Sequence, residues 1–146
     1  MSSTINKILQ SYCLDNSSIN KRDIENCLLD IIGKTKTFLI STPEYEISPY
    51  EMECFKRSIK LLNDGVPLAY IIGNQDFYGY NYFIDSNVLI PRAETEIIIP
   101  EVLKQGDLLF KKNKKLKLID AGTGSGCIGL TIARERPDWD IVLIDN

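Results

Sequence analysis

The sequence predicts a mixed α/β chain in which a small helical bundle comes first, a β-hairpin follows and a strand–helix–strand unit comes last. Apolar residues recur at helical spacing in the first part of the chain. Aromatic residues then alternate loosely over residues 76–84, as in a hairpin. From Leu116 onward, a glycine-rich turn and a helical pattern separate two short apolar runs.

Three helices are predicted in the bundle. Asn20 can cap the second helix and Gly33 can end it. The third begins at Ser48, because Pro49 suits a first helical turn and Glu51 completes a capping box with the serine. The apolar stripes of the three helices are Ile5, Ile8, Leu9 and Tyr12; Ile24, Leu28, Ile31 and Ile32; and Met52, Phe55, Ile59 and Leu62. These stripes are the expected core.

The middle of the chain is predicted to form a hairpin, a short apolar run and a further helix. The hairpin spans residues 76–84 and turns at residues 79–81, which supply glycine and asparagine. Residues 88–90 form the apolar run. The helix is expected over residues 95–104, where Pro100 either kinks it or makes it start late.

The last part is predicted to be one strand–helix–strand unit. Residues 116–120 form the first strand and residues 141–144 the second. Ile128, Ile132 and Ala133 give the intervening helix its apolar face. A crossover of this length favours parallel strands and a right-handed connection.

Bulk properties restrict the function. The chain has 146 residues and a formal net charge of −3, which allows one compact domain or two small ones. Nucleic acid and membrane surfaces are not expected as direct partners, because a mildly acidic molecule has no overall field that attracts them. The basic run at residues 111–115 is interpreted as a solvated loop rather than a phosphate-contacting patch.

Cysteine and histidine usage excludes several kinds of site. The four cysteines, Cys13, Cys27, Cys54 and Cys127, are scattered and there is no histidine, so no metal site is predicted. Without histidine, Ser-His and Cys-His nucleophilic mechanisms are also excluded. Buried free thiols indicate a reducing compartment. Together with an N-terminus that lacks a signal-peptide pattern, they predict a cytoplasmic protein.

The most informative motif is residues 117–126 (KLIDAGTGSG). Glycine permits positive φ and lets backbone N–H groups approach a ligand, and the helix that follows adds its free donors and positive dipole end. Asp145 follows the second strand and can accept hydrogen bonds from both hydroxyls of a ribose. The pattern therefore favours a nucleotide-like cofactor.

Two cofactors compete for this loop. Its last two glycines and Gly129 spell G-x-G-x-x-G, with Asp145 about 20 residues further on, as in NAD-binding folds. Gly129 would already lie inside the helix, however. The additional Gly122 and the preceding Asp120 fit D-x-G-x-G-x-G better, which resembles motif I of the Rossmann-like class I methyltransferases that use S-adenosylmethionine. A tight turn without a ligand is the third interpretation.

Further strings resemble one methyltransferase family. Residues 65–73 (GVPLAYIIG) resemble its G-x-P-x-x-Y-I-x-G segment, and residues 77–79 its F-x-G step. Residues 89–96 (LIPRAETE) resemble L-I-P-R-P-E-T-E, with Ala93 where proline is usual. With its helical opening, nearly the whole chain resembles the N-terminal half of release-factor glutamine methyltransferases, the PrmC/HemK family.

The resemblance implies transfer of a methyl group from S-adenosylmethionine to the amide nitrogen of a glutamine in a Gly-Gly-Gln motif of a peptide chain release factor. It implies a substrate-recognition domain over residues 1–73, a hairpin linker over 74–90 and the incomplete start of the S-adenosylmethionine-dependent domain over 91–146. The implied cofactor-binding residues are Asp120, Gly122, Thr123, Gly124, Ser125, Gly126 and Asp145, with Arg92, Thr95 and Glu96 near the cofactor mouth. No catalytic residue is assigned, because the family's Asn-Pro-Pro-Tyr motif would lie beyond Asn146.

Several alternatives stay open. Arg92 and Glu96 lie four residues apart and could simply pair at a helix start. The chain could be half of a methyltransferase, a non-catalytic module that binds a release factor, or an NAD-binding oxidoreductase fragment.

Two parallel strands cannot be covered on both faces by one crossover, so residues after Pro91 are expected to be poorly stable alone or to pack on another part.

Overall fold

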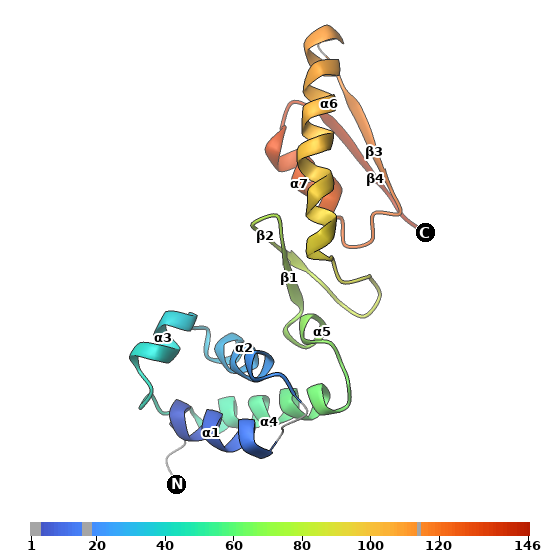
Figure 1. Cartoon of the computed structure of the whole chain (residues 1–146). Helices are drawn as coiled ribbons and strands as arrows, with labels where there is room; N and C mark the ends of the chain where they lie inside the picture. Colours follow the sequence, from blue (N-terminus) through green and yellow to red (C-terminus); the bar gives the residue numbers. More distant parts are fainter. Residues whose placement is uncertain (1–3, 16–18, 114) are drawn as a thin grey trace. The chain divides into compact units, whose positions relative to one another are not determined.

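The computed structural model describes residues 4–15, 19–113 and 115–146. The chain divides into two compact units, Met1–Ile72 and Gly73–Asn146. The first unit is helical, and the second combines helices with two small sheets, as the ribbon in Figure 1 shows. The predicted mixed α/β class is therefore confirmed.

The three predicted helices of the first unit are present with the predicted caps. The helices of this unit are α1 (Ile5–Asp15), α2 (Lys21–Ile32), α3 (Lys36–Ser41), α4 (Pro49–Asn63) and α5 (Leu68–Ile72). The Asn20 side chain accepts from the Arg22 backbone N–H, and Gly33 ends α2 at φ +63°. Ser48 and Glu51 form both bonds of the capping box, at 3.2 and 2.7 Å. The short helices α3 and α5 were not predicted, because neither is long enough to carry an apolar stripe.

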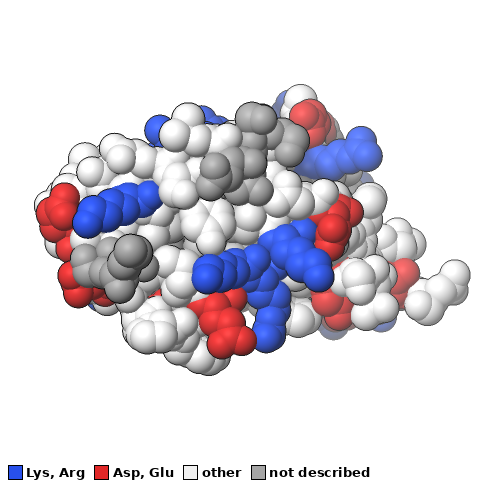
Figure 2. All heavy atoms as spheres, turned by 90° about the horizontal axis from the view of Figure 1, so that it is seen from below, with Lys and Arg blue, Asp and Glu red and all other residues white. Residues whose placement is uncertain are grey.

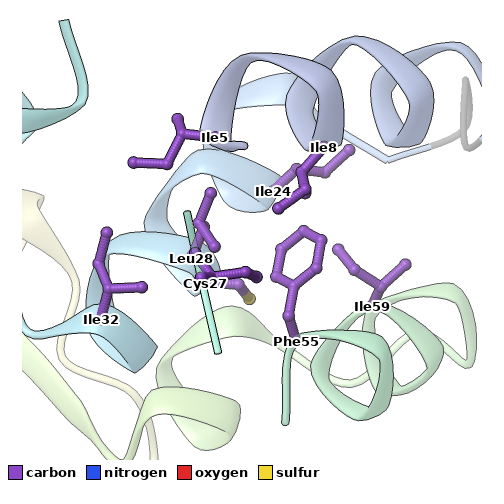
Figure 3. Close-up of a cluster of buried hydrophobic side chains, with 9 residues drawn as sticks. Ile5, Ile8, Ile24, Cys27, Leu28, Ile32, Phe55 and Ile59 are labelled. Carbon is purple, nitrogen blue, oxygen red and sulfur yellow. The ribbon is translucent and has the colours of Figure 1, made fainter. Parts of the chain in front are cut away.

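The core of the first unit joins α1, α2 and α4. Phe55 of α4 is fully buried and points between the side chains of Ile8 and Ile24 (Figure 3). The ring of Tyr12 meets it edge to face, with the ring centres 5.0 Å apart. The buried members of this cluster are Ile5, Ile8, Ile24, Cys27, Leu28, Ile32, Ile47, Phe55 and Ile59. The helical stripes in the sequence thus meet in one apolar core.

The second unit begins with an antiparallel hairpin of β1 (Asn74–Phe77) and β2 (Tyr80–Phe83). The predicted turn at residues 79–81 is wrong, because the turn residues are Tyr78 and Gly79, at φ +51° and +75°. A two-residue hairpin turn that matches strand twist needs positive φ at both positions. Tyrosine adopts that conformation at a cost, so the sequence pointed to the later glycine–asparagine stretch instead.

The predicted helix over residues 95–104 consists of two parts. A 3₁₀ turn, Ala93–Ile97, leads into α6 (Ile98–Asn113), with Pro100 in the first helical turn. The late start is therefore the correct alternative, because the missing N–H of proline costs nothing there. The predicted loop at residues 111–115 is wrong in part. Lys111 and Lys112 extend α6, where cations favour the negative helix end, Lys114 lies outside the described residues and Lys115 is exposed.

The strand–helix–strand unit is as predicted, with β3 (Lys117–Ala121), α7 (Cys127–Glu135) and β4 (Asp140–Ile144). The strands are parallel, with Leu118 opposite Ile141 and Ala121 opposite Ile144. Helix α7 packs on both strands and on α6 (Figure 1). Both strands therefore deliver their carboxyl ends to the same edge of the sheet.

One face of this parallel pair is partly exposed to solvent among the described residues. Asp120 and Leu143 lie opposite each other and both approach Gly129 of α7, so they mark the covered face. Because side chains alternate along a strand, Ile119 and Ile144 belong to the other face, and they are 57% and 49% exposed.

Among the described residues, no helix combines the length and apolar character needed to cross a bilayer.

Candidate functional site

The loop from β3 to α7 has the backbone that its glycines suggest. Gly122, Gly124 and Gly126 lie at φ +73°, +54° and +77°, a region that other residues rarely adopt. The N–H groups of Gly122 and Thr123 donate to the Ile144 carbonyl at 2.8 and 3.1 Å, which ties the loop to the end of β4. The loop is therefore a fixed bend at the carboxyl edge of the sheet.

The space above this bend is open. A Cβ added at Gly122 or Gly124 would have no heavy atom of the described residues within 4 Å, apart from its chain neighbours. Gly129, in contrast, lies against β4, where a Cβ would overlap the Leu143 side chain and press on Asp120. The loop glycines thus leave room for a ligand, while Gly129 allows close packing of helix on strand.

Asp120 anchors the loop through two hydrogen bonds. Its Oδ2 atom accepts from the Thr123 hydroxyl at 2.8 Å and from the Gly129 backbone N–H at 2.9 Å. One carboxylate oxygen therefore connects the loop to the first turns of α7. Asp120 therefore positions the loop relative to α7.

Asp145 lies beside the same loop, as its place after β4 predicted. Its Oδ2 atom accepts from the Gly124 backbone N–H at 2.7 Å, and Oδ1 accepts from the Asn146 N–H at 3.0 Å. The side chain is exposed, so each carboxylate oxygen has further lone pairs open to solvent. To accept hydrogen bonds from two hydroxyl groups, the Asp145 carboxylate must point into the open space over the loop.

A hollow of about 160 Å³ lies over the loop. Arg92 and Thr95 line it together with the glycine bend, so the structure brings these predicted residues together. The full lining is Leu89, Ile90, Pro91, Arg92, Thr95, Gly122, Thr123, Gly124, Ser125, Cys127 and Ile128. Pockets for small molecules usually measure about 300–1,000 Å³. This hollow is therefore smaller than a usual small-molecule pocket.

Glu96 lies elsewhere. Its Oε1 atom accepts from the Tyr78 backbone N–H at 3.0 Å, in the turn of the hairpin. The predicted helical pairing of Arg92 with Glu96 does not account for this carboxylate, because residues 93–97 form a 3₁₀ turn. With three residues per turn, Arg92 and Thr95 share one side and Glu96 lies about a third of a turn away.

The sequence reasoning missed the apolar wall of the hollow. Leu89 and Ile90 were interpreted as a short apolar run and as the start of the family string at residues 89–96, not as part of the site, although Leu89 is 74% exposed next to the loop. Cys127 and Ile128 complete the wall from the start of α7. Burial raises the pKa of the Cys127 thiol above its ordinary value, so this thiol is neutral and acts as an apolar lining atom. The sequence held no direct signal for this wall, because the exposure of Leu89 and its place beside the loop arise only in the folded chain.

Charge and metal-binding side chains add no second site. The described residues contain no cluster of three or more side chains with metal-ligating groups. On the face seen in Figure 2, lysine and arginine are interspersed with aspartate and glutamate. That mixture fits the small net charge of −3.

Known proteins are similar to this chain in sequence. Residues 11–73 match the family model described as the PrmC N-terminal domain. A release factor glutamine methyltransferase of Coxiella burnetii is 35% identical over 130 residues, which cover 89% of this chain and 46% of that protein. Proteins of the same name from Clostridium botulinum and Mycoplasma mycoides are 36% and 33% identical over 142 and 145 residues.

The chain belongs to the release factor glutamine methyltransferase family. The match to the PrmC N-terminal domain ends at Gly73, the first residue of the second unit. The Clostridium botulinum alignment covers 94% of this chain, so the family likeness includes the glycine loop as well as the helices. The chain spans about half the length of the curated relatives that it matches.

Proposed function

We propose that this chain supplies the release-factor-binding helices and the first part of the cofactor site of a protein-glutamine N-methyltransferase. The whole enzyme would move a methyl group from S-adenosylmethionine to the amide nitrogen of the glutamine in a Gly-Gly-Gln motif of a release factor. The observation that carries the proposal is the bend of positive-φ glycines at the end of β3, with Asp120 beneath it and Asp145 beside it.

The residues of the bend suit S-adenosylmethionine. The open space over Gly122 and Gly124 admits the methionine end of the cofactor next to the backbone. Asp145 would exchange its bond to the Gly124 N–H for the ribose hydroxyls, or keep it and accept the hydroxyls on its second oxygen. Arg92 and Thr95 would close the mouth of the hollow. When bound, the cofactor supplies an electrophilic methyl group on a sulfonium.

The chemistry places clear demands on the remaining residues. An amide nitrogen is a weak nucleophile because its lone pair is delocalised, so the enzyme must orient it in line with the methyl group and accept its N–H hydrogens. The Asn-Pro-Pro-Tyr motif that the resemblance implies for this task does not occur in these 146 residues. We therefore assign cofactor binding to this chain and assign none of its residues to binding of the acceptor amide.

The family match, which ends at Gly73, supports a recognition role for the first unit. We propose that the helices of residues 1–73 bind the release factor in the cytoplasm, and that the unit from Gly73 onward belongs to the methyl-transferring domain. A fragment of residues 1–73 should then bind a purified release factor in a calorimetric titration. Absence of binding by this fragment, with binding by the whole chain, would contradict the division of roles.

Cofactor choice can be tested by heating the protein with each candidate. A ligand that binds the native state raises the unfolding midpoint, and the rise grows with the logarithm of the ratio of ligand concentration to dissociation constant. Because the hollow is small, we expect a small rise with millimolar S-adenosylmethionine and none with NAD. Replacing Asp145 with alanine should abolish the rise, whereas the exposed control Asp138→Ala should keep it. A rise with NAD alone would overturn the proposed cofactor.

A further inference from the structure

We propose that Glu96 is a positioning residue for the cofactor hollow. Its carboxylate connects the hairpin turn to the segment that carries Arg92 and Thr95, and so fixes the wall that faces the glycine bend. The inference rests on the proposed function in one respect, because the hollow must be the cofactor site for its wall to matter in binding.

The bond from Glu96 to Tyr78 has features of a built contact. It spans 18 residues of sequence and joins a partly buried carboxylate to a backbone N–H at 3.0 Å. Tyr78 is, among the described residues, the one non-glycine position with positive φ. The hairpin ladder ends at the pair Phe77–Tyr80, so the N–H of the turn residue needs an acceptor from outside the strands. A charged acceptor compensates the strained turn more strongly than a neutral one.

The hairpin itself is attached to α7. The Tyr82 and Thr131 hydroxyls lie 2.7 Å apart and both side chains are buried. The Tyr80 hydroxyl donates to Glu135 at 2.9 Å. The Arg134 guanidinium stacks over the Tyr80 ring, 4.6 Å from its centre. These three contacts, all within about one turn of α7, fix β2 on the helix whose first turn borders the hollow.

These contacts connect the two sides of the hollow through the hairpin. Helix α7 begins at the glycine bend, the hairpin is attached to α7, and Glu96 attaches the hairpin to the opposite wall of the hollow. Thr95 lines the hollow while Glu96, one residue later, points to the hairpin. Without Glu96, the wall segment keeps its covalent connections and the packing of α6 on α7, but it loses its direct link to the hairpin.

The test compares three variants of the whole chain by backbone NMR. Glu96→Ala removes the acceptor, Glu96→Gln keeps a neutral one, and Glu94→Ala removes an exposed acid from the same 3₁₀ turn. In Glu96→Ala we expect loss of exchange protection at the Tyr78 amide and altered amide signals for Arg92 and Thr95. Glu96→Gln should restore most of the protection, and Glu94→Ala should resemble the wild type. Unchanged Tyr78 protection in Glu96→Ala would overturn the inference.

A second readout measures binding of S-adenosylmethionine at a temperature where each variant is folded. We expect the dissociation constant of Glu96→Ala to rise at least about fivefold, the lower end of ordinary coupling between sites, with recovery in Glu96→Gln. Equal affinity in wild type and Glu96→Ala would overturn the positioning role even if the Tyr78 bond is lost. If the wild type binds no cofactor, the proposed function falls, and the exchange data still decide whether Glu96 holds the wall. If Glu96→Ala fails to fold, Glu96→Asp, which shortens the acceptor by one methylene, takes its place: weaker Tyr78 protection and weaker binding are expected, and wild-type values of both would overturn the inference.

Discussion

The two units of the chain use different means to hold their elements together. In the first unit, capped helices meet in an apolar core in which Phe55 is fully buried. In the second, hydroxyl, carboxylate and guanidinium contacts such as Tyr82–Thr131 and Arg136–Asp107 join the helices to the hairpin and loops. In the sheet formed by β3 and β4, Ile119 is 57% exposed. The second unit also buries apolar side chains such as Phe77, Ile99 and Ile132, and the site lies in this unit, where polar contacts add to that packing.

The largest expected effect is on the apolar core. Phe55→Ala should lower the free energy of unfolding by about 3–5 kcal/mol, because a buried aromatic ring is lost and leaves a cavity. Urea unfolding followed by circular dichroism measures it, since helices dominate the first unit. The control Tyr50→Ala removes a ring that is 76% exposed and should change stability by less than about 0.5 kcal/mol. A small effect of Phe55→Ala would remove the contrast between the units.

The second unit has one tight apolar contact that sharpens the comparison. A Cβ at Gly106 of α6 would overlap the Trp139 ring. Gly106→Ala should therefore destabilise the unit by about 1–3 kcal/mol, although the same change inside an exposed helix is favourable. Trp139 is the only tryptophan of the sequence, so its fluorescence follows the unit directly. The control is Gln105→Ala, on the exposed side of the same helix, and stabilisation by Gly106→Ala would contradict this packing.

The hairpin contact comes next. Tyr82→Phe leaves the buried Thr131 hydroxyl without its partner and should cost about 1–2 kcal/mol in the tryptophan-monitored transition. Tyr80→Phe removes an equivalent hydroxyl near solvent, where water can replace it at Glu135, so its effect should be smaller. The reverse order of the two variants would show that the hairpin is not held by its buried bond.

The smallest effect concerns alkaline pH. Burial in the first core raises the pKa of Cys27 from 9.0 to about 12. The folded chain therefore keeps the thiol neutral while the unfolded chain ionises it, so this contribution is complete below pH 9 and is lost as pH rises toward 12. The urea midpoint should fall less steeply over that range in Cys27→Ala than in the wild type or in Cys54→Ala. Parallel slopes in all three proteins would contradict the burial of this thiol.

Local signals in the sequence were enough for the parts of the fold that depend on local chemistry. The Ser48–Glu51 capping box, the Gly33 stop and the order strand, glycine bend, helix, strand follow from neighbouring residues. The Tyr78 turn did not, because its positive φ is compensated by Glu96, a residue 18 positions away. Pairings of that range are set by how elements pack, and one sequence contains no direct record of them.

The same distinction applies to the candidate site. The glycines and the two acids were predicted from spacing, and the structure places Asp120 and Asp145 at the bend. Arg92 and Thr95 were predicted only through the family resemblance, and they line the hollow. Glu96 was placed with them, but its carboxylate faces the hairpin. The 3₁₀ geometry that separates Glu96 from its neighbours was not visible in the sequence.

The most direct test is a titration of the chain carrying ¹⁵N-glycine. The sequence has nine glycines, of which three form the bend and two, Gly33 and Gly65, end helices of the first unit. Addition of S-adenosylmethionine should move the signals of Gly122, Gly124 and Gly126 and leave those of Gly33 and Gly65 in place. If the bend signals stay fixed at millimolar S-adenosylmethionine, or respond to NAD instead, the bend is not part of a methyl-donor site.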